Sequence, residues 1–274
     1  MVTEEEASTW EVVDNPKFYR QVTIKDTVRD ALFVAIGAMK SELLTSEEFL
    51  NAPDYAERLA EEMNDVSPET IAAAGTYLQD TKENVYSFET DSGKADMITG
   101  KVAANYQWSG DAVYTMDQAD EDDFELDFAI PRESTNLYFD GWVMLKSGVG
   151  DDTEKRQAAQ AFINFVSKPE NAVRNMYYIG YTSVISGGDD PMVFDYLDWN
   201  YGAEDDEEDV VEYPVGYFFT GDNSDEDYIL TVPRKQTKRQ LSAQYPDEAA
   251  MNRSAVMQYF DGDTNTEINQ MWIE

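Results

Sequence analysis

The stretch VTIKDTVRDALFVAIGAM, residues 22–39, predicts a strand, a tight turn and a helix in direct succession. Residues 22–24 alternate apolar and polar side chains, which is typical of a β-strand. Asp26 and Thr27 then provide side-chain oxygens that can cap the first turn of a helix. Four apolar residues share one face of that helix: Val28, Leu32, Ile36 and Met39. A strand, turn and helix in this order favour an α/β protein.

The alternation of strand and helix signals continues to about Tyr181. A capping box at Thr45 and Glu48 and the pair Ser67-Pro68 indicate the starts of two helices. Because strands alternate with helices, the sheet is expected to be largely parallel. Helices are predicted for 46–63, 68–80, 110–116 and 153–166, with another starting at Pro169. Strands are predicted for 85–88, 102–107, 126–130 and 142–145, the last apolar throughout, as in a strand covered on both faces.

The second half of the chain gives three further expectations. The helix at 153–166 is expected to turn four apolar residues inward: Ala159, Phe162, Ile163 and Val166. Residues 185–230 contain acidic runs, so they are predicted to be solvated loops between short strands that carry aromatic residues. A final amphipathic helix is predicted around Ile268, Met271 and Trp272.

The composition is that of a folded, acidic protein. Of 274 residues, 42% are apolar and 13% are aromatic, which is enough to form one or two domains. Lys and Arg total 20 against 56 Asp and Glu, giving a formal net charge of -36. Nucleic acids and anionic membrane surfaces would repel this charge, whereas cationic partners are favoured. The charge also suits solubility, so it identifies no ligand by itself.

Cysteine and histidine are both absent from the sequence. Their absence excludes disulfides, thiolate nucleophiles and a Ser-His-Asp triad, and it removes the ordinary ligands of zinc. Residues 261–265 are similar to the start of a calcium loop, but Thr266 and Trp272 replace its glycine and its bidentate glutamate. We therefore predict neither a metal site nor a cofactor. No segment is long and apolar enough to span a bilayer, and the first residues are not a secretory signal.

Three segments share their order and spacing with a known family. They contain WEVVDNPKFY at 10–19, WSGDA at 108–112 with NLYFDG at 136–141, and KPENA at 168–172. Together they resemble the bacterial spermidine/putrescine-binding proteins, which have the type II periplasmic binding protein fold. The resemblance covers about residues 10–182 and continues weakly at 244–247 and 256–258.

The resemblance implies an α/β fold like that of the type II periplasmic binding proteins, with a mixed, mainly parallel sheet. One lobe would be largely complete and the other partial. Lobe two would comprise 16–137 and 190–274, lobe one would be represented by 138–189, and 1–15 would be a crossover or N-terminal extension. Members of the family carry a signal peptide and further first-lobe sequence before this point, so the chain is expected to be truncated. A homodimer is a further expectation, because a strand at 142–146 would lack its usual partners.

A polyamine site needs carboxylates for its ammonium groups and aromatic faces for its methylene stems. By resemblance, Asp140 is the first candidate for the carboxylate that pairs with an amine. The other ligand-binding residues that the resemblance implies are Trp108, Tyr138, Tyr181, Asp30, Thr27, Asp26 and Gln258. Tyr138 stands where the family usually has tryptophan, and Thr27 where it often has an acid. The aromatic residues also fit an ordinary core, and the two aspartates before and in the helix also fit dipole stabilisation.

The resemblance implies a non-catalytic protein, the substrate-binding component of an ABC importer. It would capture spermidine or putrescine between two lobes and deliver it to the permease, at the extracellular face of the membrane or in the periplasm. Alternatives are a binding protein for another small solute and an acidic module that binds another protein. An enzyme with paired carboxylates needs neither His nor Cys, but chance pairs are unavoidable among 56 acidic residues.

Overall fold

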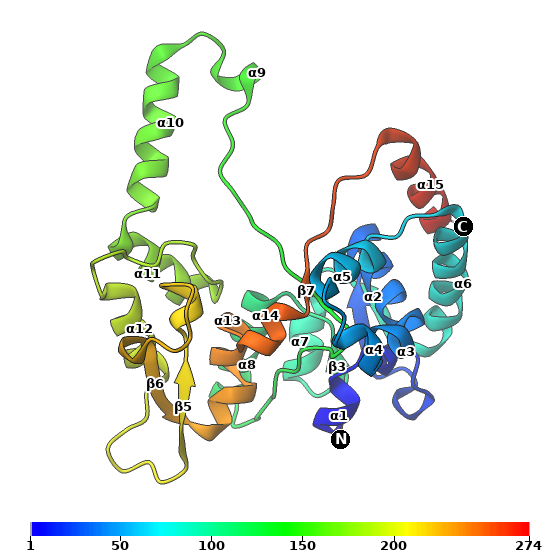
Figure 1. Ribbon diagram of the computed structural model, residues 1–274, viewed down its shortest axis with the longest axis horizontal. Coiled ribbons are helices and arrows are strands. Elements are labelled where there is room, and N and C mark those ends of the chain that lie inside the picture. Colours follow the sequence, from blue (N-terminus) through cyan, green and yellow to red (C-terminus); the bar gives the residue numbers. More distant parts are fainter. Residues whose placement is uncertain (1, 274) are drawn as a thin grey trace. The chain divides into compact units, whose positions relative to one another are not determined.

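The computed structural model describes residues 2–273, and these residues form two compact units (Figure 1). Unit 1 comprises residues 2–108, 115–138 and 248–273, and unit 2 comprises residues 109–114 and 139–247. Unit 1 is therefore discontinuous in sequence. Residues 190–247, which the sequence analysis groups with 16–137, lie instead with 139–189 in unit 2.

A parallel three-stranded sheet in the order β2-β1-β3 organises unit 1. The central strand β1 (Val22–Lys25) is buried along its whole length. It pairs in parallel with β2 (Ser87–Glu89) on one side and with β3 (Ala104–Asn105) on the other. The strand at 22–24 and the parallel arrangement confirm the predictions, while β2 and β3 are shorter than predicted.

Helix α2 (Val28–Met39) follows β1 after a two-residue turn. The hydroxyl oxygen of Thr27 accepts a hydrogen bond from the backbone N–H of Asp30, so Thr27 is the N-cap residue, as predicted. The helix packs against α6 (Pro68–Asn84), which begins after its predicted cap, Ser67. Both helices cover the central sheet with apolar side chains, which gives unit 1 its core.

The single helix predicted for 46–63 is wrong. The structure has two helices instead, α4 (Glu47–Leu50) and α5 (Tyr55–Met63). Pro53 separates them, because proline disfavours the helical conformation at the residue before it.

The predicted final helix is confirmed as α15 (Gly262–Ile273), in which Ile268 is buried. The helix predicted at 110–116 is confirmed and is longer, forming α8 (Ser109–Glu121). The remaining elements of unit 1 are short: α1 (Glu4–Ala7), η1 (Trp10–Val13), η2 (Pro16–Phe18), α3 (Ser41–Leu44), α7 (Ser92–Ile98), β4 (Thr135–Asn136), α14 (Glu248–Asn252) and β7 (Ser254–Ala255). β4 and β7 pair with each other in parallel.

The buried carboxylate of Glu133 joins segments of unit 1 that are far apart in sequence. It accepts hydrogen bonds from the hydroxyl of Thr9, from Oγ of Ser41 at 2.8 Å and from the backbone N–H of Trp10 at 3.4 Å. The Trp10 indole N–H donates to the carbonyl oxygen of Ser134 at 2.8 Å. These bonds fix the N-terminal segment to the residues before β4.

Asp65 links the end of α5 to the start of α6. Its Oδ2 accepts hydrogen bonds from Thr70 at 2.6 Å and from the Lys40 ammonium at 3.0 Å, and its Oδ1 accepts one from the backbone N–H of Ser67 at 3.0 Å. Burial opposes the ionised form of Asp65, but these hydrogen bonds outweigh it and hold the pKa of Asp65 well below its ordinary value.

Replacing Asp65 with asparagine is expected to lower the free energy of unfolding by about 1–2 kcal/mol at neutral pH. Because the pKa is lower in the folded than in the unfolded chain, this stabilisation is present above the unfolded value of about 4 and is lost as the pH falls toward the folded pKa. Urea unfolding followed by circular dichroism should show a difference in the free energy of unfolding between wild type and Asp65→Asn, and this difference should become smaller in acid. The exposed Asp54→Asn variant is the control. A difference in the free energy of unfolding that stays constant with pH would contradict a stabilising role for the ionised Asp65.

Unit 2 is built around an antiparallel hairpin, β5 (Val210–Pro214) and β6 (Ile229–Pro233). Its core contains Leu197, Leu230 and Tyr245, all almost fully buried. The Tyr213 hydroxyl donates to the carbonyl oxygen of Tyr245 at 2.7 Å. The other elements that pack here are α11 (Pro169–Ile179), α12 (Met192–Tyr201), η3 (Gly216–Phe218), η4 (Glu226–Tyr228), η5 (Arg234–Lys238) and α13 (Gln240–Gln244).

The prediction of loops and short strands for 185–230 is partly wrong, because α12 is a helix of ten residues. The buried residues of α12 are Val193, Tyr196, Leu197 and Tyr201, which recur at helical spacing. Four of its ten residues are aromatic, which suggested strands, but the spacing indicates a helix.

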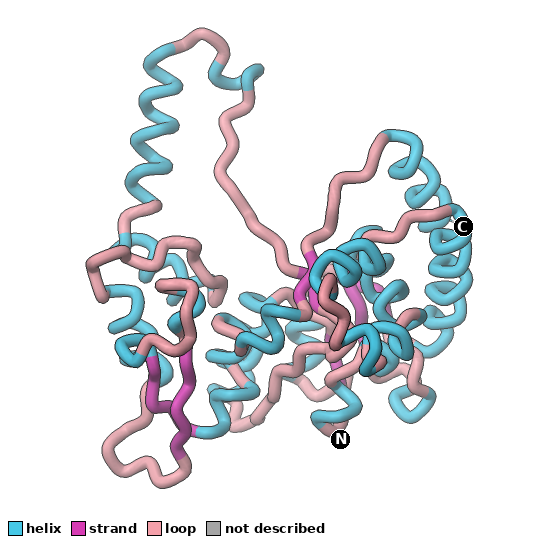
Figure 2. Tube along the Cα trace, viewed as in Figure 1, coloured by secondary structure: helices cyan, strands magenta, loops and turns pink. Residues whose placement is uncertain are grey.

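Two predicted strands are absent from the structure. Residues 126–130 form a partly exposed loop in unit 1, and no strand among the described residues pairs with it. Residues 142–145 are extended loop (Figure 2), with exposed fractions of 65%, 80%, 43% and 66%. An apolar run needs neighbouring strands to bury it, and the sheets of the described residues place none beside this one.

The helix predicted for 153–166 is confirmed with the same bounds as α10 (Thr153–Val166), preceded by α9 (Lys146–Val149). Its predicted burial is wrong, because none of its residues is buried and Phe162 is 49% exposed. No helix in the described part of the chain is both long and apolar enough to cross a membrane.

Candidate functional site

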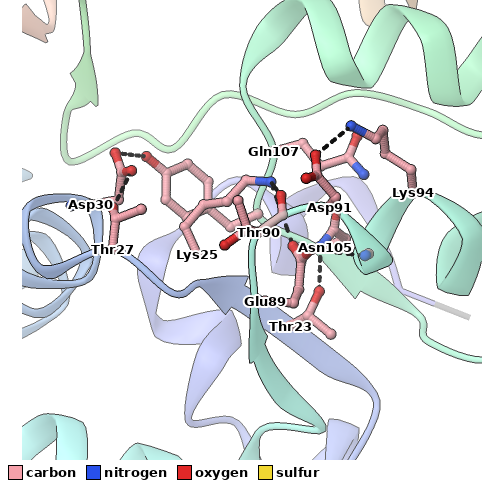
Figure 3. A network of polar contacts seen from close by, with 12 residues as sticks. Thr23, Lys25, Thr27, Asp30, Glu89, Thr90, Asp91, Lys94, Asn105 and Gln107 are labelled. Carbon is pink, nitrogen blue, oxygen red and sulfur yellow. Dashed lines mark hydrogen bonds and ion pairs between the residues drawn. The ribbon is translucent and has the colours of Figure 1, made fainter.

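Polar side chains follow all three strands of the unit 1 sheet, at the edge where the parallel strands end (Figure 3). Lys25 ends β1, Glu89 ends β2 and Asn105 ends β3. The first turn of α2 begins at the same edge. In open α/β sheets, ligands bind outside the carboxyl ends of the strands, so this edge is the candidate site.

One side of the site is centred on the carboxylate of Asp30, which is 8% exposed. Its Oδ2 accepts a hydrogen bond from the Thr27 hydroxyl at 2.5 Å, and its Oδ1 accepts one from the Tyr106 hydroxyl at 3.3 Å. Burial raises the pKa of Tyr106 well above its ordinary value, and the charges of Asp30 and Tyr138 raise it further. The Tyr106 hydroxyl therefore stays protonated and keeps donating to the carboxylate.

The other side of the site is a buried ion pair between Lys25 and Glu89, whose side chains are 1% and 3% exposed. The Lys25 ammonium lies 3.5 Å from Oε1 of Glu89, donates to the carbonyl oxygen of Thr90 at 2.8 Å and lies 4.6 Å from the ring centroid of Trp108. A buried charge is tolerated only when it is paired and hydrogen-bonded, and Lys25 meets both conditions.

Glu89 is itself held in place from two directions. Its Oε2 accepts a hydrogen bond from the backbone N–H of Gly93 at 2.8 Å, and its Oε1 accepts one from the Asn105 amide at 3.0 Å. The same amide donates to the hydroxyl of Thr23. A Cβ atom on Gly93 would collide with Asn105 and Glu89, so this close approach requires glycine.

Two buried polar atoms at this edge have no hydrogen-bond partner among residues 2–273. They are Oδ1 of Asn105 and Nε2 of Gln107. Unsatisfied buried polar atoms are rare in folded proteins, so each of these is a candidate contact for an ordered water or a bound molecule. An acceptor and a donor are thus available beside the ion pair.

The structure brings together several of the predicted site residues at this edge. Asp30 and Thr27 belong to the cluster around Tyr106, Tyr138 interacts electrostatically with Tyr106, and the Lys25 ammonium lies over the ring of Trp108. Asp26 is exposed in the turn between β1 and α2, and its backbone N–H donates to the carbonyl oxygen of Glu89 at 2.8 Å.

Three other predicted residues lie elsewhere in the two units. Gln258 belongs to unit 1, where its backbone bonds to Arg29 and Asn64 while the residue is exposed. Tyr181 belongs to unit 2 and packs its ring against Gly110. Asp140 also belongs to unit 2 and is exposed in the loop before α9. A ligand-binding role for these three residues stays a prediction.

Sequence reasoning missed Lys25, Glu89, Asn105 and Tyr106. A signal for them was present, because each stands at or just after the end of a parallel strand, where side chains converge. Among the described residues, no group of three or more acidic side chains is placed to hold a metal ion. A hollow of about 630 Å³ between α6 and α15 is lined by none of the site residues.

Known proteins resemble this chain in sequence and in fold. Residues 15–194 match the family of bacterial extracellular solute-binding proteins. Among solved structures, the spermidine/putrescine ABC transporter substrate-binding protein of Streptococcus pneumoniae is similar at 19% identity with a TM-score of 0.59, over 99% of this chain and 62% of that one. A putative spermidine/putrescine ABC transporter from Listeria monocytogenes is similar at 21% identity with a TM-score of 0.62, over 97% of this chain and 60% of that one.

A third similar structure is the PotD lipoprotein of Treponema pallidum, at 15% identity with a TM-score of 0.58, over 97% of this chain and 60% of that one. At these identities the likeness shows the fold, and it confirms the predicted α/β architecture of periplasmic binding proteins. The chain spans about three fifths of the length of these proteins.

Proposed function

The chain belongs to the family of bacterial extracellular solute-binding proteins, and we propose that it captures a polyamine for an ABC importer. The observation that carries this proposal is the Asp30 carboxylate at the carboxyl edge of the sheet. Two hydroxyl groups orient it, those of Thr27 and Tyr106, and the second of them belongs to an aromatic side chain. An ammonium group on a hydrocarbon chain is bound by this combination of a carboxylate and aromatic faces.

The charge of Asp30 is available to a ligand. A carboxylate offers about four acceptor positions, and hydrogen bonds from two hydroxyls leave the others open. The adjacent Arg29 directs its guanidinium away, to the carbonyl oxygen of Gln258 at 2.5 Å and to the ring of Phe260 at 4.2 Å. A formal net charge of -36 would also raise the local concentration of cations and speed their association.

The same family membership supports the rest of the proposed role. The protein would act without catalysis outside the cytoplasmic membrane, close two lobes around the amine and hand it to a permease. The similar structures from Streptococcus and Listeria are described as parts of spermidine/putrescine ABC transporters, which supports a polyamine over other solutes. Asp140, Tyr181 and Gln258 remain proposed ligand-binding residues.

Titration calorimetry of the chain with putrescine and spermidine tests the proposal directly. We expect saturable binding of an amine that weakens as salt is added, because the recognition is between charges. Glutamate and a neutral sugar serve as controls of similar size. Saturable binding of a control with none for either amine, or no effect of millimolar amine on either heat or thermal stability, would contradict the proposal.

A further inference from the structure

The surroundings of the Lys25 ammonium are those of a binding site for a free amine. A carboxylate, a backbone carbonyl and an aromatic face all contact it, from Glu89, Thr90 and Trp108. These are the groups that bind alkylammonium ligands in proteins. Here the cation is a side chain of the protein itself, at the edge where a ligand is expected.

This arrangement is unusual for a lysine at the end of a strand. Lysine side chains ordinarily run along the surface and keep the ammonium in water. As a whole residue, backbone included, Lys25 is instead 0% exposed, and its partner Glu89 is 5% exposed. A buried ion pair gives little net stability compared with apolar side chains of the same volume, so stability alone does not account for it.

The groups that surround the Lys25 ammonium are also held in place independently of Lys25. The backbone N–H of Gly93 and the amide of Asn105 hold the Glu89 carboxylate. Thr90 follows β2 directly, and Trp108 stands three residues after the end of β3 and directly before α8. Removing the lysine side chain would therefore leave a preformed, negatively charged hollow beside an aromatic ring. Such a hollow has the shape and charge for an unbranched alkylammonium ion.

We propose that Lys25 is a tethered ammonium that fills one cation subsite of the sheet edge and thereby sets amine selectivity. The subsite follows from the contacts of Lys25 alone, whereas its effect on selectivity rests on the proposed function. Because Lys25 occupies this position and repels further positive charge, a bound amine can use Asp30 but not Glu89. The site therefore favours a diamine over a longer polyamine that needs another carboxylate.

Chemical rescue of Lys25→Ala tests the subsite. The variant leaves Glu89 buried without its counter-charge, so its Tm is expected to fall. n-Propylammonium, which matches the three methylenes and the ammonium that the substitution removes, is expected to restore at least half of the lost Tm. 1-Propanol, of similar size but neutral, should not do so, and neither wild type nor the exposed Lys82→Ala variant should respond to propylammonium. Adding Glu89→Gln to Lys25→Ala should abolish the rescue.

Equal effects of propylammonium and propanol on Lys25→Ala would overturn the proposal. If the variant does not fold, the yield of soluble protein after refolding from urea is measured with each additive, and equal yields overturn it in the same way. Calorimetry then tests selectivity, since Lys25→Ala should bind spermidine at least tenfold more tightly relative to putrescine than wild type does. Rescue without polyamine binding by either protein would support the subsite and contradict the proposed function.

Discussion

Replacement of Glu133 with alanine is expected to lower the free energy of unfolding of unit 1 by about 2–4 kcal/mol. The carboxylate is 0% exposed and accepts hydrogen bonds from Thr9, Trp10 and Ser41. Without it, these three donors stay buried and lose their acceptor, and a buried donor without a partner is costly. The N-terminal segment would also lose its attachment to the residues before β4.

Urea unfolding and hydrogen exchange measured by mass spectrometry distinguish this effect from a general loss of stability. Exchange should increase most in peptides that cover residues 9–13 and 131–136. Glu133→Gln keeps one acceptor oxygen, so its loss of stability should be intermediate. Glu121→Ala, at an exposed position, should unfold like wild type. Equal stability of Glu133→Ala and Glu121→Ala would show that this network does not hold unit 1 together.

Replacement of Asp30 with asparagine is expected to weaken amine binding by about 30-fold or more, because removing one partner of a buried charge pair costs about 2–5 kcal/mol. Asparagine has nearly the same shape as aspartate but no charge. Its neutral side chain can still accept a hydrogen bond from Thr27 or Tyr106, so the local structure is expected to persist. The stability cost is limited to the favourable charge at the start of α2, about 0.3–1 kcal/mol.

Asp80→Asn is the matched control for this measurement, because it removes the same charge from an exposed position on α6. Both variants lower the magnitude of the net charge equally, so any effect of long-range attraction is the same in both. Calorimetry should therefore show weaker amine binding for Asp30→Asn only, with Asp80→Asn binding the amine like wild type. If Asp30→Asn also binds like wild type, the ammonium group is held by another carboxylate, and Asp140 is the next to test.

The parts of the fold that could be predicted have local causes. The cap at Thr27 and the helix α2 depend on residues a few positions apart, and so do the bounds of α10. The strand predicted at 142–145 was wrong for a non-local reason, since an apolar run becomes a strand only where other strands pair with it. The burial predicted for α10 was wrong for the same reason, because a helix face is buried only by what packs on it.

The candidate site also contains residues that the sequence could indicate and residues that only the folded structure shows. The family resemblance implied Asp30 and Thr27 as ligand contacts, and the cap at Thr27 could be predicted from the residues themselves. The role of Lys25 could not be predicted, since a lysine at a strand end is ordinarily solvated and its carbonyl partner is 65 residues away. Only the folded arrangement shows that the ring of Trp108 contacts an internal cation.

The discontinuity of unit 1 determines when it can fold during synthesis. Its core joins Trp10 and Ile24 to Ala255, Phe260 and Ile268, whereas residues 139–247 belong with 109–114 to unit 2. At the usual speed of translation, residues 139–247 take on the order of ten seconds to make. During that interval the early strands of unit 1 lack β7 and α15, and at its end every residue of unit 2 has been made. Unit 2 is therefore complete in sequence before unit 1, although most of unit 1 is translated first.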